Sequence, residues 1–151
     1  MEQRMQMAAV APEGYRRVLA LESYVRDAVE PPLFGLIKLR ASVVNGCAFC
    51  VDMHGTDLLG QGEDVRRVLA VSAWRESTFF TDRERIAFAL TDEVTRLDAD
   101  GVSDAVWDAA VKEFGEADLA NLILAIATIN TWNRIAVSTH AAAPPLEPAN
   151  G

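Results

Sequence analysis

The chain has 151 residues, of which 50% are hydrophobic and 24% are charged, and this composition is ordinary for one folded globular domain. Its formal charge of -8 and isoelectric point of about 4.7 disfavour nucleic-acid binding, because phosphate recognition needs clustered Lys and Arg, and they also disfavour anionic membranes. No apolar stretch reaches bilayer-spanning length, and the first ten residues lack an apolar run. We therefore expect a protein of the reducing cytoplasm, without a membrane span or a secretory signal.

Long segments with a hydrophobic period of about 3.6 residues, separated by short breaks rich in Gly or Pro, predict an all-α fold of about six to seven helices. In chain order, helices are expected over residues 12–28, 33–45, 47–60, 64–74, 81–97, 104–114 and 116–140. No alternating strand pattern and no strong internal repeat is visible. We assign residues 1–140 to a single domain and expect residues 141–151, which contain three prolines, to form a disordered tail.

The sequence indicates where the helix over residues 81–97 starts and where the last helix lies in the fold. Thr81, with Glu84 three residues later, has the form of a capping box. The last helix is apolar on nearly all sides, which is typical of a helix at the centre of a core or in an oligomer interface. Asn130 and Asn133 interrupt its apolar surface. Because buried amides need partners, we expect both to bond backbone groups or to line a polar cavity.

The only two cysteines, Cys47 and Cys50, and one of the two histidines, His54, follow the turn signal Asn45-Gly46. At 100° per residue, these three positions fall within about 60° of one helix face, so the sulfurs can reach each other. Cys47 is expected near a helix N-terminus, where the helix dipole lowers a thiol pKa. His54 can accept a proton from Cys50 or stabilise its thiolate as an imidazolium. Asp57, three residues further on, can orient the ring.

Two other interpretations of this group stay open. The cysteines can be inert and buried, although in a reducing compartment a lone Cys-x-x-Cys is more typical of catalysis or metal binding than of a structural disulfide. The spacing Cys-x-x-Cys-x-x-x-His can also supply three zinc ligands with an open fourth position. No fourth protein ligand is evident, because the other histidine, His140, lies near the end of the last helix. We therefore expect no metal, and no cofactor beyond a redox-active disulfide between Cys47 and Cys50.

Residues 39–54, which include Asn-Gly-Cys-Ala-Phe-Cys-Val-Asp-Met-His, resemble the AhpD-like alkylhydroperoxidases of the carboxymuconolactone decarboxylase family. Residues 81–85 and 129–134 also look like segments of its small single-domain members, and the likeness spans residues 36–137. The resemblance implies an all-α fold assembled into homo-oligomers, with sites near the subunit contacts. It also implies thiol-dependent reduction of hydroperoxides.

The resemblance assigns a role to each residue of the group. Cys50 is the attacking thiol, Cys47 the resolving thiol and His54 the base. The helix terminus by itself favours Cys47 as the more acidic thiol. We keep the roles that the resemblance implies, because His54 lies four residues after Cys50 and can deprotonate it directly.

One position departs from the family pattern. Family members with a complete proton relay carry a Glu twelve residues before the first cysteine, and this chain has Gly35 there. Glycine supplies neither an acid nor a base. Either another carboxylate takes its place, for which Glu84 and Asp57 are the candidates, or the relay is impaired.

The sequence thus predicts a two-cysteine peroxidase or disulfide reductase that acts on organic hydroperoxides in antioxidant defence. Its expected partners are an organic hydroperoxide or other small molecule, an external dithiol that reduces the disulfide, and further copies of the same chain. Two alternatives stay open. One is a decarboxylase-type enzyme of the same family that does not use the thiols, and the other is a redox-sensing oligomer without catalytic activity.

Overall fold

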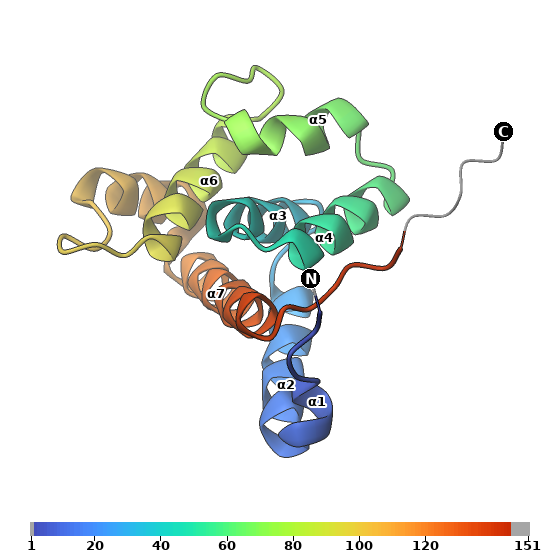
Figure 1. Ribbon diagram of the computed structural model, residues 1–151. Helices are drawn as coiled ribbons and strands as arrows, with labels where there is room; N and C mark the ends of the chain where they lie inside the picture. Colours follow the sequence, from blue (N-terminus) through green and yellow to red (C-terminus); the bar gives the residue numbers. More distant parts are fainter. Residues whose placement is uncertain (1, 146–151) are drawn as a thin grey trace, which may run out of the picture.

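Seven α-helices and one short 3₁₀ turn make up the regular structure of residues 2–145, the part of the chain that the computed structural model describes (Figure 1). In chain order the elements are α1 (Met7–Val10), α2 (Pro12–Ala28), α3 (Leu33–Asn45), α4 (Ala48–Gly60), α5 (Val65–Ala70), the 3₁₀ turn η1 (Val71–Ala73), α6 (Asp82–Thr95) and α7 (Asp104–Thr139). No strand occurs within residues 2–145, so the predicted all-α fold class is confirmed.

The observed helices differ from the predicted ones in a few places. The sequence-based prediction lacks α1, because four residues are too few to show a helical period. The helix predicted over residues 64–74 tightens into a 3₁₀ turn after Ala70. The break predicted at Gly115 lies inside α7, where this residue has a φ of 72° and a ψ of 168° and separates two helical segments. The expected disorder of residues 141–151 stays a prediction, and its part over 146–151 lies outside the described residues.

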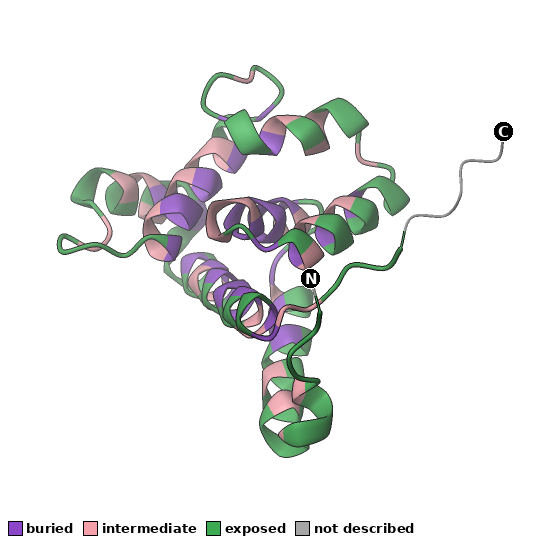
Figure 2. Cartoon of the chain, viewed as in Figure 1, coloured by how far each residue is buried: buried purple, intermediate pink, exposed green. Residues whose placement is uncertain are grey.

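Helix α3 lies in the middle of the molecule, with α4, α6 and α7 around it, and most of its residues are buried and none is exposed (Figures 1 and 2). Its apolar side chains belong to two hydrophobic clusters on different sides. The first cluster joins α2, α3, α6 and α7 and includes Val25, Leu33, Ile37, Leu90 and Ile126. The second joins α3, α4, η1 and α6 and includes Leu36, Leu39, Leu58, Val71 and Phe88. Because α3 is enclosed in this way, its two charged side chains, Lys38 and Arg40, are buried as well.

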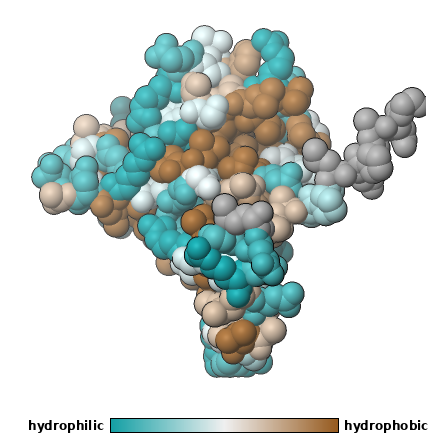
Figure 3. Space-filling view, in the orientation of Figure 1, coloured by the Kyte–Doolittle hydropathy of each residue, from teal (hydrophilic) through white to brown (hydrophobic). Residues whose placement is uncertain are grey.

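Helix α2 is the most exposed long helix and projects with α1 away from the rest of the molecule (Figure 2). Only Glu22 and Val25 are buried among its 17 residues. Apolar side chains gather in the middle of the face drawn in Figure 3, above the projecting α1 and α2. Within residues 2–145, no helix combines the length and the apolar character that crossing a bilayer requires.

Candidate active site

The turn between α3 and α4 places Cys47 at the start of a helix. Gly46 adopts a left-handed conformation, with a φ of 65°, at the C-terminus of α3. Its N–H donates to the Val43 carbonyl at 3.2 Å, and the N–H of Cys47 donates to the Ser42 carbonyl at 3.0 Å. These two bonds form a Schellman motif, which is a common way for a helix to end at glycine. The Asn45-Gly46 signal in the sequence therefore fixes the backbone that leads directly into Cys47.

Cys47 is the N-cap residue of α4, and its sulfur is bonded in two ways. The backbone N–H of Cys50 donates to Cys47 Sγ at 3.3 Å, and the two cysteines form a disulfide with a Cα–Cα distance of 5.3 Å. Both residues are about 1% exposed and pack against Ala136 of α7. One helical turn therefore brings the sulfurs together, as their spacing predicted. A thiolate at Cys47 would lie at the positive end of the α4 dipole.

A cavity of about 560 Å³ opens beside the disulfide. Of the two cysteines, Cys50 lines it and Cys47 lies behind. Most of the lining is apolar or aromatic and comes from the N-terminal segment, α2, α4 and α7, including Met5, Met7, Tyr15, Leu19, Phe49, Met53, Trp132 and Ile135. Four charged side chains, Glu22, Arg26, Lys38 and Asp57, also reach it. An apolar cavity with a few polar groups around a reactive atom is typical of a small-molecule site.

His54 lines the same cavity as Cys50 and is only 5% exposed. Burial lowers the pKa of His54 from 6.5 to about 3, and the positive charge of Lys38 adds to this effect. The ring is therefore neutral at physiological pH, which opposes the imidazolium role that the sequence left open. No described residue gives the buried Nε2 atom a hydrogen-bond partner. A buried polar atom without a hydrogen-bond partner costs free energy. We therefore infer that Nε2 bonds a group that is present at another stage of function.

Asp57 is a weak partner for His54. Its Oδ2 atom lies 3.9 Å from His54 Nδ1, which is too far for a hydrogen bond, and its side chain is 62% exposed. With the ring proton on Nδ1, the nitrogen nearer the carboxylate, Nε2 is left as an acceptor toward the interior. Asp57 thus lies at the solvent edge of the site and can only bias the tautomer of His54.

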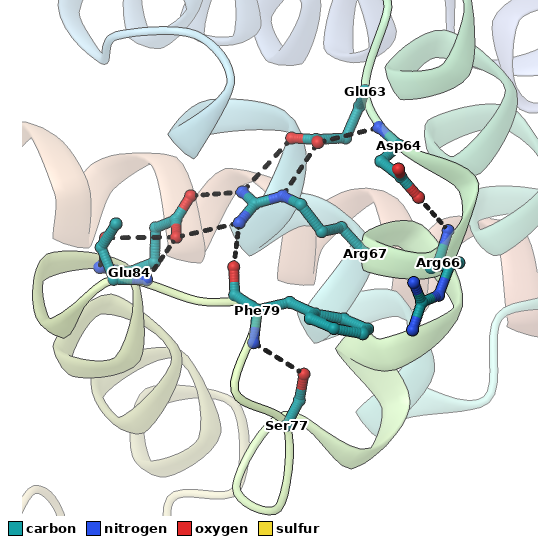
Figure 4. Close-up of polar contacts among 8 residues, drawn as sticks. Glu63, Asp64, Arg66, Arg67, Ser77, Phe79 and Glu84 are labelled. Atoms are coloured by element: carbon teal, nitrogen blue, oxygen red, sulfur yellow. Dashed lines mark hydrogen bonds and ion pairs between the residues drawn. The ribbon is translucent and has the colours of Figure 1, made fainter.

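The structure does not bring Glu84 to the cysteines. Its carboxylate accepts the N–H of Thr81 at 2.8 Å and Arg67 Nη2 at 2.6 Å, and its own N–H donates to Thr81 Oγ1 at 3.2 Å. The predicted capping box is therefore present. Figure 4 shows the Arg67 guanidinium between Glu84 and Glu63, close to the Phe79 carbonyl. Glu84 is not among the residues that line the cavity, and its hydrogen bonds serve to join α5 to α6.

Gly35, the position of the absent family acid, lies where α3 and α4 pack together. A Cβ atom there would meet Leu58 Cδ2 at 2.6 Å, closer than van der Waals contact allows. Leu58 is fully buried and belongs to the cluster between α3, α4 and α6. This chain thus uses position 35 for close helix packing.

A buried ion pair beside the cysteines escaped the sequence analysis. Lys38 Nζ on α3 donates to Glu22 Oε1 on α2, and Trp132 Nε1 on α7 donates to Glu22 Oε2 at 3.1 Å. Both charged side chains are 8% exposed. Burial lowers the pKa of Lys38, and the hydrogen bond to Glu22 opposes that shift. A lysine inside an apolar run was the only hint in the sequence, since nothing indicated that a glutamate 16 residues earlier would meet it.

The two asparagines of α7 bond to the segment that precedes Cys47. Asn45 Nδ2 donates to Asn130 Oδ1 at 3.0 Å and to Asn133 Oδ1 at 2.8 Å, and Asn133 Nδ2 donates to Ser42 Oγ at 3.0 Å. Asn130 also donates to the Ile126 carbonyl and to Thr95. The expected backbone bond is present for Asn130, whereas Asn133 bonds the side chains of Asn45 and Ser42 instead. The network fixes the end of α3, and with it the turn to Cys47, against α7.

The residues that the structure describes, 2–145, contain no group of three or more His, Cys, Asp and Glu side chains arranged to hold a metal ion. The three zinc ligands considered from the sequence are arranged differently. The two sulfurs are bonded to each other, and His54 is buried with one nitrogen near Asp57.

Comparisons with known proteins agree with this architecture. The model of the carboxymuconolactone decarboxylase family matches residues 12–93. The uncharacterized protein YdfG of Bacillus subtilis is 34% identical over 139 residues, which cover 91% of this chain and 95% of YdfG. The uncharacterized protein YnjA of Escherichia coli is 28% identical over 105 residues, which cover 70% of this chain but only 57% of YnjA.

Two solved structures have the same fold. A crystal structure of a protein of unknown function from Agrobacterium tumefaciens, described as a candidate antioxidant defence protein AhpD, superimposes with a TM-score of 0.93. It shares 38% identity with this chain, and the match covers 96% of this chain and 100% of that one. An uncharacterized peroxidase-related protein from Silicibacter sp. TM1040 has a TM-score of 0.76 at 17% identity, with coverage of 85% and 69%, a likeness of fold alone.

Proposed function

Because the chain belongs to the carboxymuconolactone decarboxylase family, we propose that it is an AhpD-like thiol peroxidase that reduces organic hydroperoxides through Cys50 and Cys47. One observation carries the proposal: the Cys50 end of a disulfide lines an apolar cavity together with a neutral histidine whose inward nitrogen has no partner. The candidate antioxidant role of the Agrobacterium tumefaciens protein supports the same activity.

The first half of the cycle oxidises Cys50. In the reduced protein, the Cys50 thiol is the donor that His54 Nε2 lacks in the disulfide form, since residues four apart meet on a helix. The thiol proton passes to His54, and the sulfur attacks the terminal oxygen of the hydroperoxide. The S–O bond forms, the O–O bond breaks, and the organic part leaves as an alkoxide that takes up one proton. The products are a Cys50 sulfenic acid and an alcohol.

The second half returns the enzyme to its dithiol form. Cys47 attacks the Cys50 sulfenic acid, which releases water and forms the disulfide. One thiol of an external dithiol then attacks Cys50 from the cavity, and Cys47 leaves as a thiolate. The second thiol of the reductant attacks the resulting mixed disulfide and frees Cys50, so the reductant leaves as its own disulfide. The N–H of Cys50 and the α4 dipole stabilise that thiolate, which makes Cys47 the better leaving group. The helix terminus thus favours Cys47 as a leaving group in reduction, while the cavity and His54 favour Cys50 as the nucleophile.

The surroundings of Cys50 support the class of substrate. The methionine, aromatic and aliphatic side chains of the cavity suit an apolar hydroperoxide better than hydrogen peroxide. The proposed cycle needs a dithiol reductant and no flavin, haem or metal, and it operates in a reducing compartment such as the cytoplasm. We propose a homo-oligomer as the working form.

The test is to measure thiol alkylation against pH by mass spectrometry, on the fully reduced protein, with and without one equivalent of cumene hydroperoxide. We expect one thiol to react at a pH well below the ordinary cysteine pKa of about 8.5, and the peroxide to convert both thiols into an intramolecular disulfide. Cys47→Ser should instead accumulate a sulfenic acid at Cys50. Slow alkylation near pH 8.5 with no peroxide reaction would contradict the proposal.

Gly35 favours a second candidate, a redox sensor that forms the disulfide without catalytic turnover, because the family acid is missing. Steady-state consumption of cumene hydroperoxide with dithiothreitol as reductant separates the two. Turnover supports the peroxidase, whereas a single oxidation event that changes the oligomeric state supports the sensor. An activity that survives alkylation of both cysteines would instead support a decarboxylase-type enzyme.

A further inference from the structure

The buried pair of Glu22 and Lys38 is hard to explain as a device for stability. Two charges removed from water cost more than their attraction returns unless further hydrogen bonds compensate, and an apolar pair of the same size is often as stable. Glu22 is also one of only two buried residues on the otherwise exposed α2. It is buried where α2 borders the cavity that contains Cys50, and Lys38 lines the same cavity from α3.

Peroxide reduction at Cys50 needs an acid, and the candidates other than Lys38 are poorly placed. Gly35 supplies none, and Glu84 is held in the capping box by Thr81 and Arg67. Asp57 also lines the cavity, but its side chain is 62% exposed, so solvent reaches its carboxylate. Arg26 is 63% exposed, so solvent surrounds most of its side chain. Of the two cationic side chains that line the cavity among the described residues, Lys38 is the buried one.

We propose that Lys38 is the general acid that protonates the departing alkoxide, and that Glu22 is a positioning residue that holds the ammonium in place. This inference rests on the proposed peroxidase function and names the proton donor of that same site. Glu22 is itself fixed by Trp132, whose indole N–H donates to its second carboxylate oxygen. Lys38 also lies over the Phe34 ring, with Nζ 4.6 Å from the ring centroid.

The proton balance closes within the site. The Cys50 thiol gives its proton to His54 and its sulfur forms the S–O bond as the O–O bond breaks. The Lys38 ammonium gives one proton to the alkoxide, which leaves as an alcohol, and becomes a neutral amine. The imidazolium of His54 then returns a proton to that amine. Overall, the hydrogen of the thiol ends on the alcohol, the sulfur is oxidised, and both His54 and Lys38 recover their starting states.

The pKa shifts agree with the two later transfers, from Lys38 to the alkoxide and from His54 to Lys38. The first transfer, from the Cys50 thiol to His54, is uphill and is driven by cleavage of the O–O bond. Burial lowers the pKa of Lys38, so its ammonium is a stronger acid than an exposed lysine. The charged or titratable groups that face Lys38 are Glu22 and Arg26 from α2 and His54 and Asp57 from α4. With its pKa near 3, His54 cannot retain the proton it receives and passes it on to a stronger base, such as the neutral amine of Lys38.

The experiment compares two oxidants in single-turnover oxidation of the reduced protein, quenched by alkylation and read by mass spectrometry. tert-Butyl hydroperoxide has an alkoxide leaving group that needs a proton, whereas peroxyacetic acid releases a carboxylate that needs none. We expect Lys38→Met to slow oxidation by tert-butyl hydroperoxide by about 100-fold or more. The rate with peroxyacetic acid should not fall, because loss of the Lys38 charge also makes His54 a stronger base. Lys38→Arg should lose as much as Lys38→Met, because a guanidinium keeps its proton.

The matched control is Lys112→Met at the chain's other lysine, which is exposed on α7, and it should behave as wild type with both oxidants. Glu22→Gln should move the basic limb of the tert-butyl hydroperoxide profile to lower pH, because Glu22 raises the pKa of Lys38, and Glu22→Asp should partly restore it. If Lys38→Met does not fold beside an unpaired Glu22, the neutral double variant Glu22→Gln/Lys38→Met provides the same test.

The possible outcomes separate this inference from the proposed function. The acid role of Lys38 would be overturned if Lys38→Met lost the same factor in oxidation rate with both oxidants. A wild-type rate with tert-butyl hydroperoxide in Lys38→Arg would overturn it as well. Either result would leave the proposed peroxidase function intact. If the wild-type protein reacts with neither oxidant, the proposed function itself fails.

Discussion

Helix α3 buries two cations that lie two residues apart, and their surroundings differ. Arg40 donates from Nε and Nη2 to both oxygens of Asp92, at 2.6 Å and 3.1 Å, and from Nη1 to the carbonyls of Val71 and Ser72. Asp92 also accepts bonds from Trp74 and Arg75. This cluster is well supplied with partners, and neither Arg40 nor Asp92 lines the cavity that Cys50 lines. It joins α3, the 3₁₀ turn and α6.

Lys38 faces another side of the helix, because positions two apart on a helix do not share a face. Its one hydrogen-bond partner is Glu22, and it borders a cavity shared with Cys50 and His54. His54 Nε2 in that cavity has no partner among the described residues. Buried charges therefore occur in two different settings in this fold. Arg40 and Asp92 have several hydrogen-bond partners each, and they hold helices together. Lys38 and His54 have bonding capacity left over beside a cavity, where a reaction can occur.

The comparison of the Lys38 side of α3 with its Arg40 side can be tested by substitutions. The largest loss of activity is expected for the cysteines, since Cys50 shares its cavity with Lys38. Cys50→Ser should reduce cumene hydroperoxide turnover to the rate without enzyme, because no other thiol lines the cavity. Cys47→Ser should react once and then stop, because the sulfenic acid has no resolving partner. Steady-state assays with dithiothreitol and single-turnover assays measure both effects. Sustained turnover in the Cys50→Ser variant would place the chemistry elsewhere.

The two sides should also respond to acid over different pH ranges. The folded-state pKa of His54 is about 3, below its ordinary value of 6.5, so the unfolded chain binds a proton that the folded chain does not. Stability should therefore fall as the pH drops from about 6.5 toward 3, by a few kcal/mol in all. Urea unfolding at a series of pH values measures this slope.

Protonation of Asp92 should lower the stability of the protein only in stronger acid. Burial raises the pKa of Asp92, but the hydrogen bonds of Arg40 and Arg75 outweigh burial and hold it below 3.8. Its contribution is therefore complete above about pH 4 and is lost as the pH falls through the folded-state value. The control is His54→Gln, which should flatten the slope between pH 6.5 and 4 and leave the steeper loss below it. An unchanged slope in this variant would contradict the assignment to His54.

Arg40→Met is expected to lower the stability of the protein without changing the rate of Cys50 oxidation. The change should lower the free energy of unfolding by about 2–3 kcal/mol, because Asp92 and two carbonyls lose partners while Trp74 and Arg75 still bond the carboxylate. The rate of Cys50 oxidation per folded molecule should not change. The control is Arg66→Met, at an exposed arginine of α5 that lies over the Phe79 ring, and its effect should stay within about 1 kcal/mol. A loss of oxidation rate in Arg40→Met would mean that the two sides of α3 are coupled.

The smallest expected effect concerns the turn that leads to Cys47. Gly46→Ala should cost about 1–2 kcal/mol, because a left-handed backbone disfavours a side chain. Gly14→Ala in α2, where an added methyl group meets nothing within 4 Å, should instead be neutral or stabilise the protein by up to about 1 kcal/mol. Thermal unfolding of both variants checks the contrast. Equal effects would mean that the turn carries no special strain.

Much of the fold could be predicted because its signals are local. The capping box of Thr81 and Glu84, the Schellman turn at Gly46 and the break at Gly115 each involve residues a few positions apart. The same holds for the disulfide, whose cysteines are three residues apart. α1 escaped prediction because it is too short for a period. The end of α5 was misplaced because η1 continues it with a tighter turn of the same polarity pattern.

Local sequence signals could not show which of the candidate relay residues, Glu84 or Asp57, lies near the cysteines. Glu84 was attractive as a carboxylate, but its position in the capping box already commits its oxygens to Thr81 and Arg67. Asp57 has the right spacing from His54, yet its side chain turns to solvent. Proximity along the chain predicts contact only within a helix or a turn, so it was reliable for the cysteines and unreliable for a proton relay.

The sequence by itself determined the helices, their caps and the grouping of Cys47, Cys50 and His54, because one helical turn fixes the relative positions of residues three to four apart. Only the tertiary structure decided which sulfur faces a cavity and which charges lie beside it. Glu22 lies 16 residues from Lys38 and 110 from Trp132 in the chain. Packing of α2, α3 and α7 brings these three side chains together, and no local rule can specify contacts over such separations.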